Sequence, residues 1–171
     1  MREVLPEFLD PLLLAGKEAV IAGRLAVDEM PRLRAQLVAG GVEVAVNLRL
    51  ERQPGGLRTV CGEIVGEAEL ACQRCLQPLR WQIDCRVALA VVASRAEEQR
   101  LPEGYEPLYL DGGPLATREL VEDEILLGLP LVAMHPDPAC NRELQEWQRE
   151  GIERENPFGV LEQLKDKRQR N

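Results

Sequence analysis

The residues from Val42 to Leu50 alternate strictly along the chain, and this pattern limits the possible fold more than any other stretch. Every even-numbered position is apolar, and the odd-numbered positions between them hold Glu43, Ala45, Asn47 and Arg49. Successive side chains of a β-strand point to opposite faces of a sheet. The alternation therefore predicts a strand with one buried face and one exposed face.

A second strand is predicted to bury the same face. It follows Pro54-Gly55-Gly56, and its apolar residues again fall on even numbers. A three-residue loop at 54–56 would pair Leu50 with Val60 and Val46 with Ile64, which keeps both apolar sets on one side. Such loops usually need a residue with left-handed backbone, and a glycine can supply it.

A third strand, in which the apolar residues shift to odd numbers from Leu79 to Val91, completes an antiparallel meander. We therefore predict an α+β fold in one domain over 1–155, followed by a C-terminal helical segment with a basic tail over 156–171. The sheet should have strands near 18–27, 42–53, 57–72 and 79–93, with short N-terminal helices and further helices near 117–129 and 157–166.

Four expectations concern the helices. Asp10 should cap a short helix that begins at Pro11, and a second short helix should run through residues 28–39 and end at Gly40-Gly41. Thr117 should be the N-cap of the helix after it. From Ile125 onward that helix is apolar on nearly all sides, which predicts a buried C-terminal end.

Charge and composition narrow the classes of function. The net charge is −8, which disfavours simple electrostatic attraction to nucleic acid. The chain has no run of about 18 apolar residues, and acids interrupt the N-terminal apolar stretch, so we expect a cytoplasmic protein without membrane contact. Five cysteines without an export signal favour reduced thiols or metal ligands over disulfides.

The CQRC sequence is the main candidate for a binding site. Cys72 and Cys75 need two more ligands for a closed tetrahedral zinc site, and His135 and Cys140 could supply them. Strand parity and distance place Cys61 and Cys85 elsewhere. Structural thiols without a metal are the alternative interpretation. A redox-active pair is less favoured because Pro78 and a strand follow, where a helix would be needed to activate the thiol.

Charged residues suggest contacts with RNA or with a partner protein. Arg74 and Arg80 lie near the predicted hairpin tip, where they could face RNA. The acids Glu122, Asp123 and Glu124 could dock a basic protein or, in principle, support metal-assisted hydrolysis. The basic end could touch phosphate through Lys165, Lys167, Arg168 and Arg170. A single histidine and no Gly-rich phosphate loop give no recognisable catalytic set and no small-molecule site.

Several sequence blocks, in this order and spacing, resemble one family. CQRC at 72–75, LPEGYEPLYLDGG at 101–113, LVEDEILLGLPLVAMHPDPAC at 120–140 and NPFGVLEQLK at 156–165 are similar to the YceD family, the large ribosomal RNA subunit accumulation proteins. The family motif carries over to Cys72, Arg74, Cys75, Glu122, Asp123, Glu124, His135, Cys140, Asn156, Pro157 and Phe158. No catalytic role attaches to these residues.

The resemblance implies a bacterial accessory factor, not an enzyme, that supports the synthesis, processing or stability of large-subunit (23S) rRNA. Three hypotheses follow. The chain could be a ribosome-biogenesis factor that acts through rRNA or a basic ribosomal or processing protein. It could be a zinc-stabilised interaction module without RNA contact. It could also be a hydrolase or nuclease that uses its acids and a metal.

Overall fold

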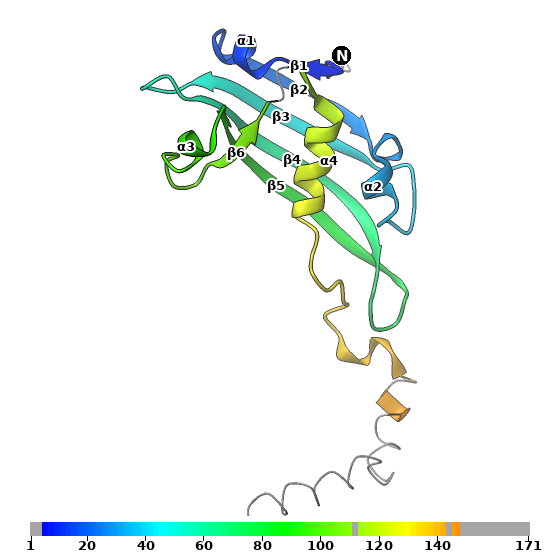
Figure 1. Ribbon diagram of the computed structural model, residues 1–171. Helices are drawn as coiled ribbons and strands as arrows, with labels where there is room; N and C mark the ends of the chain where they lie inside the picture. Colours follow the sequence, from blue (N-terminus) through cyan, green and yellow to red (C-terminus); the bar gives the residue numbers. More distant parts are fainter. Residues whose placement is uncertain (1–4, 111–112, 143–144, 148–171) are drawn as a thin grey trace, which may run out of the picture. The chain divides into compact units, whose positions relative to one another are not determined.

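The computed structural model describes residues 5–110, 113–142 and 145–147, and its centre is a five-stranded sheet in the order β2-β3-β4-β5-β6 (Figure 1). The first four strands are antiparallel neighbours, while β6 pairs with β5 in parallel. The strands are β2 (Ala19–Ala26), β3 (Glu43–Arg52), β4 (Arg58–Ala71), β5 (Pro78–Val92) and β6 (Glu106–Tyr109). The predicted α+β fold with an antiparallel meander is confirmed.

The register of the β3–β4 hairpin agrees with the sequence pattern. Leu50 pairs with Val60 and Val46 pairs with Ile64, as the shared parity requires. The Gln53 backbone N–H donates to the Leu57 carbonyl at 2.7 Å, which closes a loop over 54–56. Both loop glycines have left-handed backbone, with φ of 90° and 89°. Turn chemistry and side-chain alternation therefore select the same pairing.

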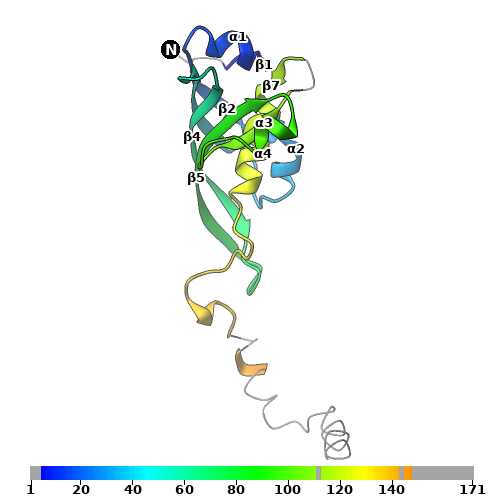
Figure 2. The same ribbon diagram turned by 60° about the vertical axis from the view of Figure 1, so that its left-hand side comes forward.

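Three short helical segments pack on the buried face of the sheet (Figures 1 and 2). They are α1 (Pro11–Ala15), α2 (Pro31–Arg34), which follows the 3₁₀ turn η1 (Val27–Glu29), and α4 (Thr117–Leu127). Leu48, Ile64 and Ile83 from the strands meet Leu33 and Ile125 from the helices in one core. Asp10 caps α1 as predicted, because its carboxylate accepts from the backbone N–H groups of Leu12 and Leu13, each at 3.0 Å.

The remaining elements close the ends of the sheet. β1 (Phe8–Leu9) pairs with β7 (Leu115–Ala116) immediately before α4. The connection from β5 to β6 contains α3 (Arg95–Glu98), because a parallel neighbour needs a crossover and cannot follow from a tight turn. No helix in the described part of the chain is long and apolar enough to cross a membrane.

Two helix predictions were wrong in detail. The helix expected to end at Gly40-Gly41 is shorter: α2 ends at Arg34, and Leu37 instead forms a bridge with Leu70 of β4. Thr117 is not an N-cap but the first residue of α4, because its hydroxyl donates to the Pro6 carbonyl at 2.5 Å instead of accepting from the helix. In both places a tertiary contact replaces the local preference.

The predicted burial after Ile125 is confirmed only in part. Ile125 itself is fully buried, but Leu127 is 74% exposed and Leu131 is 98% exposed. The helix ends at Leu127 with Gly128 as its C-cap. Leu126 and Leu129 pack against the core and Ala133 is buried in it, whereas Leu127 and Leu131 are not covered. This part of the chain is an exposed apolar surface.

From His135 onward the chain forms a second compact unit, of which residues 135–142 and 145–147 are described. Its described secondary structure includes the 3₁₀ turn η2 (Pro138–Cys140) and helical residues at 142 and 145–147. Asp137 caps this turn by accepting from the Ala139 backbone N–H at 2.8 Å. The predicted helix near 157–166 and the predicted segment 156–171 lie outside the described residues, so the domain boundary at 155 stays a prediction.

Candidate metal centre

The β4–β5 hairpin ends in a tight turn that holds the CQRC sequence. The Cys72 N–H donates to the Gln77 carbonyl at 3.0 Å, and the Leu76 N–H donates to the Cys72 carbonyl at 2.8 Å. Leu76 adopts left-handed backbone with φ of 60°, which is uncommon for a residue other than glycine. The turn places both cysteines of CxxC, three positions apart, on one short loop, with Cys72 buried and Cys75 partly exposed.

His135 and Cys140 lie in one short segment. A proline and a capping aspartate set the backbone conformation of this segment. Pro138 occupies the first position of η2, where its missing N–H costs nothing, and Asp137 caps the turn. Cys140 is the last residue of the turn, and both His135 and Cys140 are partly exposed.

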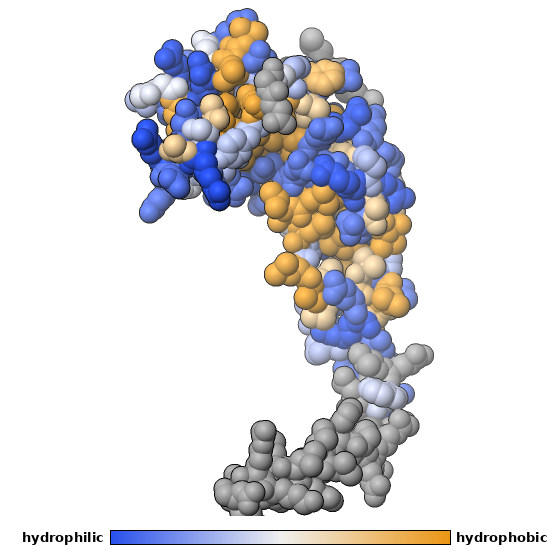
Figure 3. All heavy atoms as spheres, in the orientation of Figure 1, coloured by the Kyte–Doolittle hydropathy of each residue, from blue (hydrophilic) through white to orange (hydrophobic). Residues whose placement is uncertain are grey.

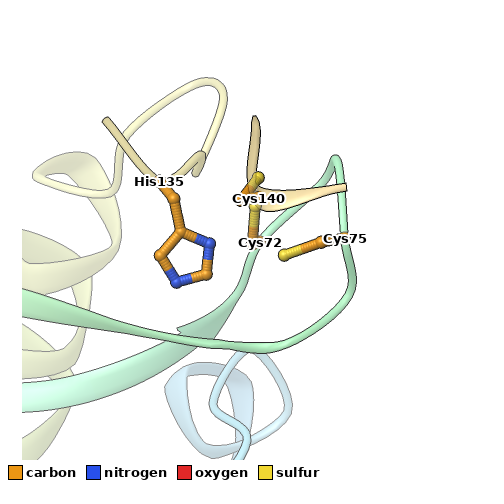
Figure 4. Close-up of side chains that lie close together, drawn as sticks. All are labelled: Cys72, Cys75, His135 and Cys140. Atoms are coloured by element: carbon orange, nitrogen blue, oxygen red, sulfur yellow. The ribbon is translucent and has the colours of Figure 1, made fainter. Parts of the chain in front are cut away.

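These residues form one candidate ligand group. One ligand atom from each of Cys72, Cys75, His135 and Cys140 lies within 4.8 Å of all the others, and Figure 4 shows the side chains gathered around a common point. With zinc–sulfur bonds of about 2.3 Å, tetrahedral geometry sets sulfur atoms roughly 3.8 Å apart. The group therefore needs only small shifts to surround an ion. Three thiolates and one imidazole are a ligand set typical of structural zinc sites.

The other two cysteines are separate from this group, as their distance from the hairpin tip predicted. Cys61 lies on β4 opposite Ala88, and Cys85 lies on β5 opposite Ile64. Burial raises the pKa of the Cys85 thiol, and the negative charges of Glu124 and Asp84 act in the same direction. Cys85 is therefore a small buried apolar residue, not a reactive thiol.

The predicted acids of α4 have different environments. Glu122 is buried at 3% exposure, and its carboxylate accepts from the backbone N–H groups of Arg32 and Leu33 at 2.7 and 3.0 Å. The Arg32 side chain donates twice more to Glu122, at 3.0 and 2.8 Å, and also pairs with Asp123 at 2.6 Å. Glu122 thus caps α2 and joins it to α4. Asp123 is exposed, and Glu124 is partly buried.

Opposing effects set the pKa of Glu122. Burial by itself raises the pKa of this carboxyl, but the hydrogen bonds from the Leu33 N–H and from the side chain and N–H of Arg32 outweigh burial and lower it. The carboxylate is therefore ionised and fully engaged with α2. Arg32 did not emerge from the sequence, because it lies 90 positions from Glu122. The one local indication of such a contact is that Met30, at the N-cap position of α2, has no side chain that can accept from the helix N–H groups, so another residue must cap the helix.

The predicted arginines at the hairpin have neighbours in the structure. Arg74 approaches the Met134 sulfur at 3.5 Å, and Arg80 lies 3.8 Å from the Glu67 carboxylate. The basic residues predicted to touch phosphate, Lys165, Lys167, Arg168 and Arg170, lie outside the described residues.

The face of the sheet opposite the helices, which we call the open face, has no aromatic side chains on β2–β5 on which RNA bases could stack. Side chains on this face are mostly charged or small, and β2–β5 place no aromatic residue there. Trp81 points to the other face, where it pairs with buried Ala68. Base stacking on these strands is therefore not supported.

Fold and site together define a small α+β protein that carries a Cys₃His candidate metal centre at a β-hairpin. Comparison with known proteins narrows this class. A sequence model of the family described as large ribosomal RNA subunit accumulation protein YceD matches residues 60–165. The chain is 32% identical over 169 residues to the large ribosomal RNA subunit accumulation protein YceD of Haemophilus influenzae, and the alignment covers 95% of this chain and 97% of that protein. The chain therefore belongs to the YceD family, and no solved structure matches it.

Proposed function

We propose that this protein supports the accumulation of large-subunit (23S) rRNA in the cytoplasm as a non-enzymatic factor. The observation that carries the proposal is the similarity over almost the full length of both chains to a protein named for that role. Two features favour a basic ribosomal or processing protein over RNA as the direct contact. The net charge is −8, and the open sheet face lacks aromatic residues on its main strands.

Removing the protein from its host cell should lower the ratio of large-subunit to small-subunit rRNA. The reason is that an accumulation factor acts on one subunit's rRNA, so the small-subunit rRNA serves as an internal reference. The measurement is the 23S-to-16S ratio of total RNA with and without a plasmid copy of the gene. Purified protein incubated with precursor rRNA and magnesium should leave the RNA uncut. An unchanged ratio would contradict the proposal, and cleavage would contradict its non-enzymatic part.

We further propose that Cys72, Cys75, His135 and Cys140 hold a structural zinc ion. The donor chemistry and the closeness of the four ligand atoms support this assignment. The cysteines would bind as thiolates and the histidine as a neutral imidazole, so binding should be stronger at neutral pH than in acid. The acids of α4 do not form a comparable ligand group in the described part of the chain. This supports a structural metal more than a hydrolytic one.

Cys72→Ser should remove the zinc. The wild-type protein should contain about one zinc per chain, and the variant should contain much less than half of that, because a hydroxyl replaces a thiolate ligand. Metal analysis of protein purified without added metal measures this. The matched control is Cys61→Ser, which changes a partly exposed cysteine outside the group and should keep its zinc. Metal-free wild-type protein of unchanged thermal stability would rule out the zinc site.

A further inference from the structure

Large apolar side chains lie exposed around the C-terminal end of α4 and the segment after it, as the orange spheres in Figure 3 show. Leu127 is 74% exposed, Leu131 98%, Val132 53% and Met134 43%, and Leu76 at the hairpin tip is 77% exposed. We call these five residues the apolar surface. Single exposed apolar residues are common on proteins, but a group of this kind usually marks an interaction site.

Backbone hydrogen bonding holds the parts of the apolar surface together. The Gln73 N–H of the hairpin tip donates to the Ala133 carbonyl at 2.8 Å, and Ala133 is buried. Arg74 contacts the sulfur of Met134 at 3.5 Å. The residues before and after Ala133 are thereby fixed beside the hairpin, so the segment is part of the folded unit and not a free strand end.

The exposed apolar side chains lie at the C-terminal end of α4 and beyond it. Leu120, Val121 and Ile125 form the buried side of the helix. Leu127, the last residue of the helix, is 74% exposed although it lies seven positions after Leu120, on nearly the same side. Leu131, Val132 and Met134 continue the exposed surface in the segment after the helix.

Carboxylates border the apolar surface. Asp123 precedes Leu127 by one helical turn, so the two share the exposed side of α4. Burial raises the pKa of Glu124, and the charges of nearby Glu106 and Asp123 raise it further. Asp123 pairs with Arg32, but no lysine or arginine among the described residues forms an ion pair with Glu106 or Glu124. The border beside Leu127 is therefore a site of excess negative charge, while Arg74 lies beside Met134.

We propose that the apolar surface binds a basic amphipathic segment of a protein partner. Apolar side chains of that segment would cover Leu127 and Leu131, while its lysines or arginines would face Glu106 and Glu124. This inference rests on the proposed function, and it assigns the surface that a basic partner would use. The same carboxylates repel RNA and anionic membranes, which carry the same charge. The acidic border is thus the observation that selects the partner class.

Photo-crosslinking in cells tests this surface with the full-length chain. A photoreactive amino acid at Val132 should give an adduct with another protein, and the linked peptide should combine lysines or arginines with apolar residues. The control position is Val20, which is 64% exposed on β2, and should not give this adduct. An adduct with rRNA, with a second copy of this chain or with its own residues 148–171 would overturn the proposal, as would no adduct.

Two sets of variants test the proposed contacts. Leu127→Ser with Leu131→Ser should lower the adduct yield about tenfold, because both side chains are exposed before binding and are expected to be covered after it. Glu106→Gln with Glu124→Gln should lower the yield less, roughly threefold, and should weaken its dependence on salt. Val20→Ser should leave the yield unchanged. A yield that is unaffected by both variant pairs would overturn the proposal.

The rRNA ratio separates this inference from the proposed function. If the 23S-to-16S ratio depends on the protein but no basic segment is linked at Val132, the proposed function stands and the inference fails. If the ratio does not depend on the protein, the proposed function fails, whatever is linked.

Discussion

Gly62→Ala should destabilise the protein by about 3 kcal/mol or more, because the new methyl group would overlap backbone and not a movable side chain. A Cβ atom at residue 62 would lie 2.0 Å from the Asn47 carbonyl oxygen and 2.9 Å from the Leu48 Cα. Both atoms belong to β3, which is paired on both sides by other strands. Relief would require β3 and β4 to separate in the middle of the sheet. Denaturant unfolding of the purified variant measures the loss.

Two other glycines provide matched controls. Gly113→Ala should change the free energy of unfolding by less than about 0.5 kcal/mol, since nothing lies within 4 Å of its added methyl group. Gly66→Ala should have an intermediate effect, because its nearest neighbour is the Val44 side chain at 3.0 Å. Equal effects at positions 62 and 113 would contradict the close approach of β3 and β4.

The meander was predictable from sequence because two independent signals agree. The side-chain period of two fixes which face of each strand is buried, and the loop at 54–56 fixes the register to one pairing. A shift of the β3–β4 pairing by one residue would expose the apolar face of β3, so few alternative registers are possible. Gly62 shows what this pattern misses: the register is continuous through it, and only the distance to Asn47 reveals why glycine is needed there.

The helices were less predictable because tertiary contacts decide where they end. Local pattern extends the helix near 31 to Gly40, but the bridge between Leu37 and Leu70 removes its second half. Likewise the apolar run after Ile125 resembles a buried helix end. Leu126 and Leu129 of this run pack against the core, and the sequence pattern does not distinguish them from exposed Leu127 and Leu131.

The candidate metal centre was predicted by residue type and not by geometry. Once distance along the strands set Cys61 and Cys85 aside, only His135 and Cys140 remained to complete a ligand set with CQRC, and these residues form the group. The roughly sixty positions between the two halves left their closeness unspecified. Glu122 shows the opposite case: the sequence singled it out for its charge, but its carboxylate is buried and engaged with Arg32.

Glu122→Ala should destabilise the protein by about 3 kcal/mol. The change leaves the N–H groups of Arg32 and Leu33 without their acceptor, and Leu33 lies in the buried core. It also removes the buried link between the start of α2 and α4 and leaves the exposed Arg32–Asp123 pair between them. Denaturant unfolding at neutral pH measures the effect. Asp123→Ala is the matched control: Asp123 is exposed and pairs with the same arginine, so it should cost less than about 1 kcal/mol.

The contribution of Glu122 should depend on pH in one direction. Because its pKa in the folded protein is below the ordinary value of 4.5, the stabilisation is fully present above pH 4.5 and is lost as the pH falls through the lowered pKa. Glu124, with a raised pKa, has the opposite effect, so the wild type alone does not isolate Glu122. The difference in unfolding free energy between wild type and Glu122→Gln isolates the contribution of Glu122, because Glu124 is present in both proteins and its effect cancels. That difference should be constant from pH 7 to about 5 and shrink below 4.5. A difference that grows in acid would mean that Glu122 is held in its neutral form, and the capping of α2 by a carboxylate would then be wrong.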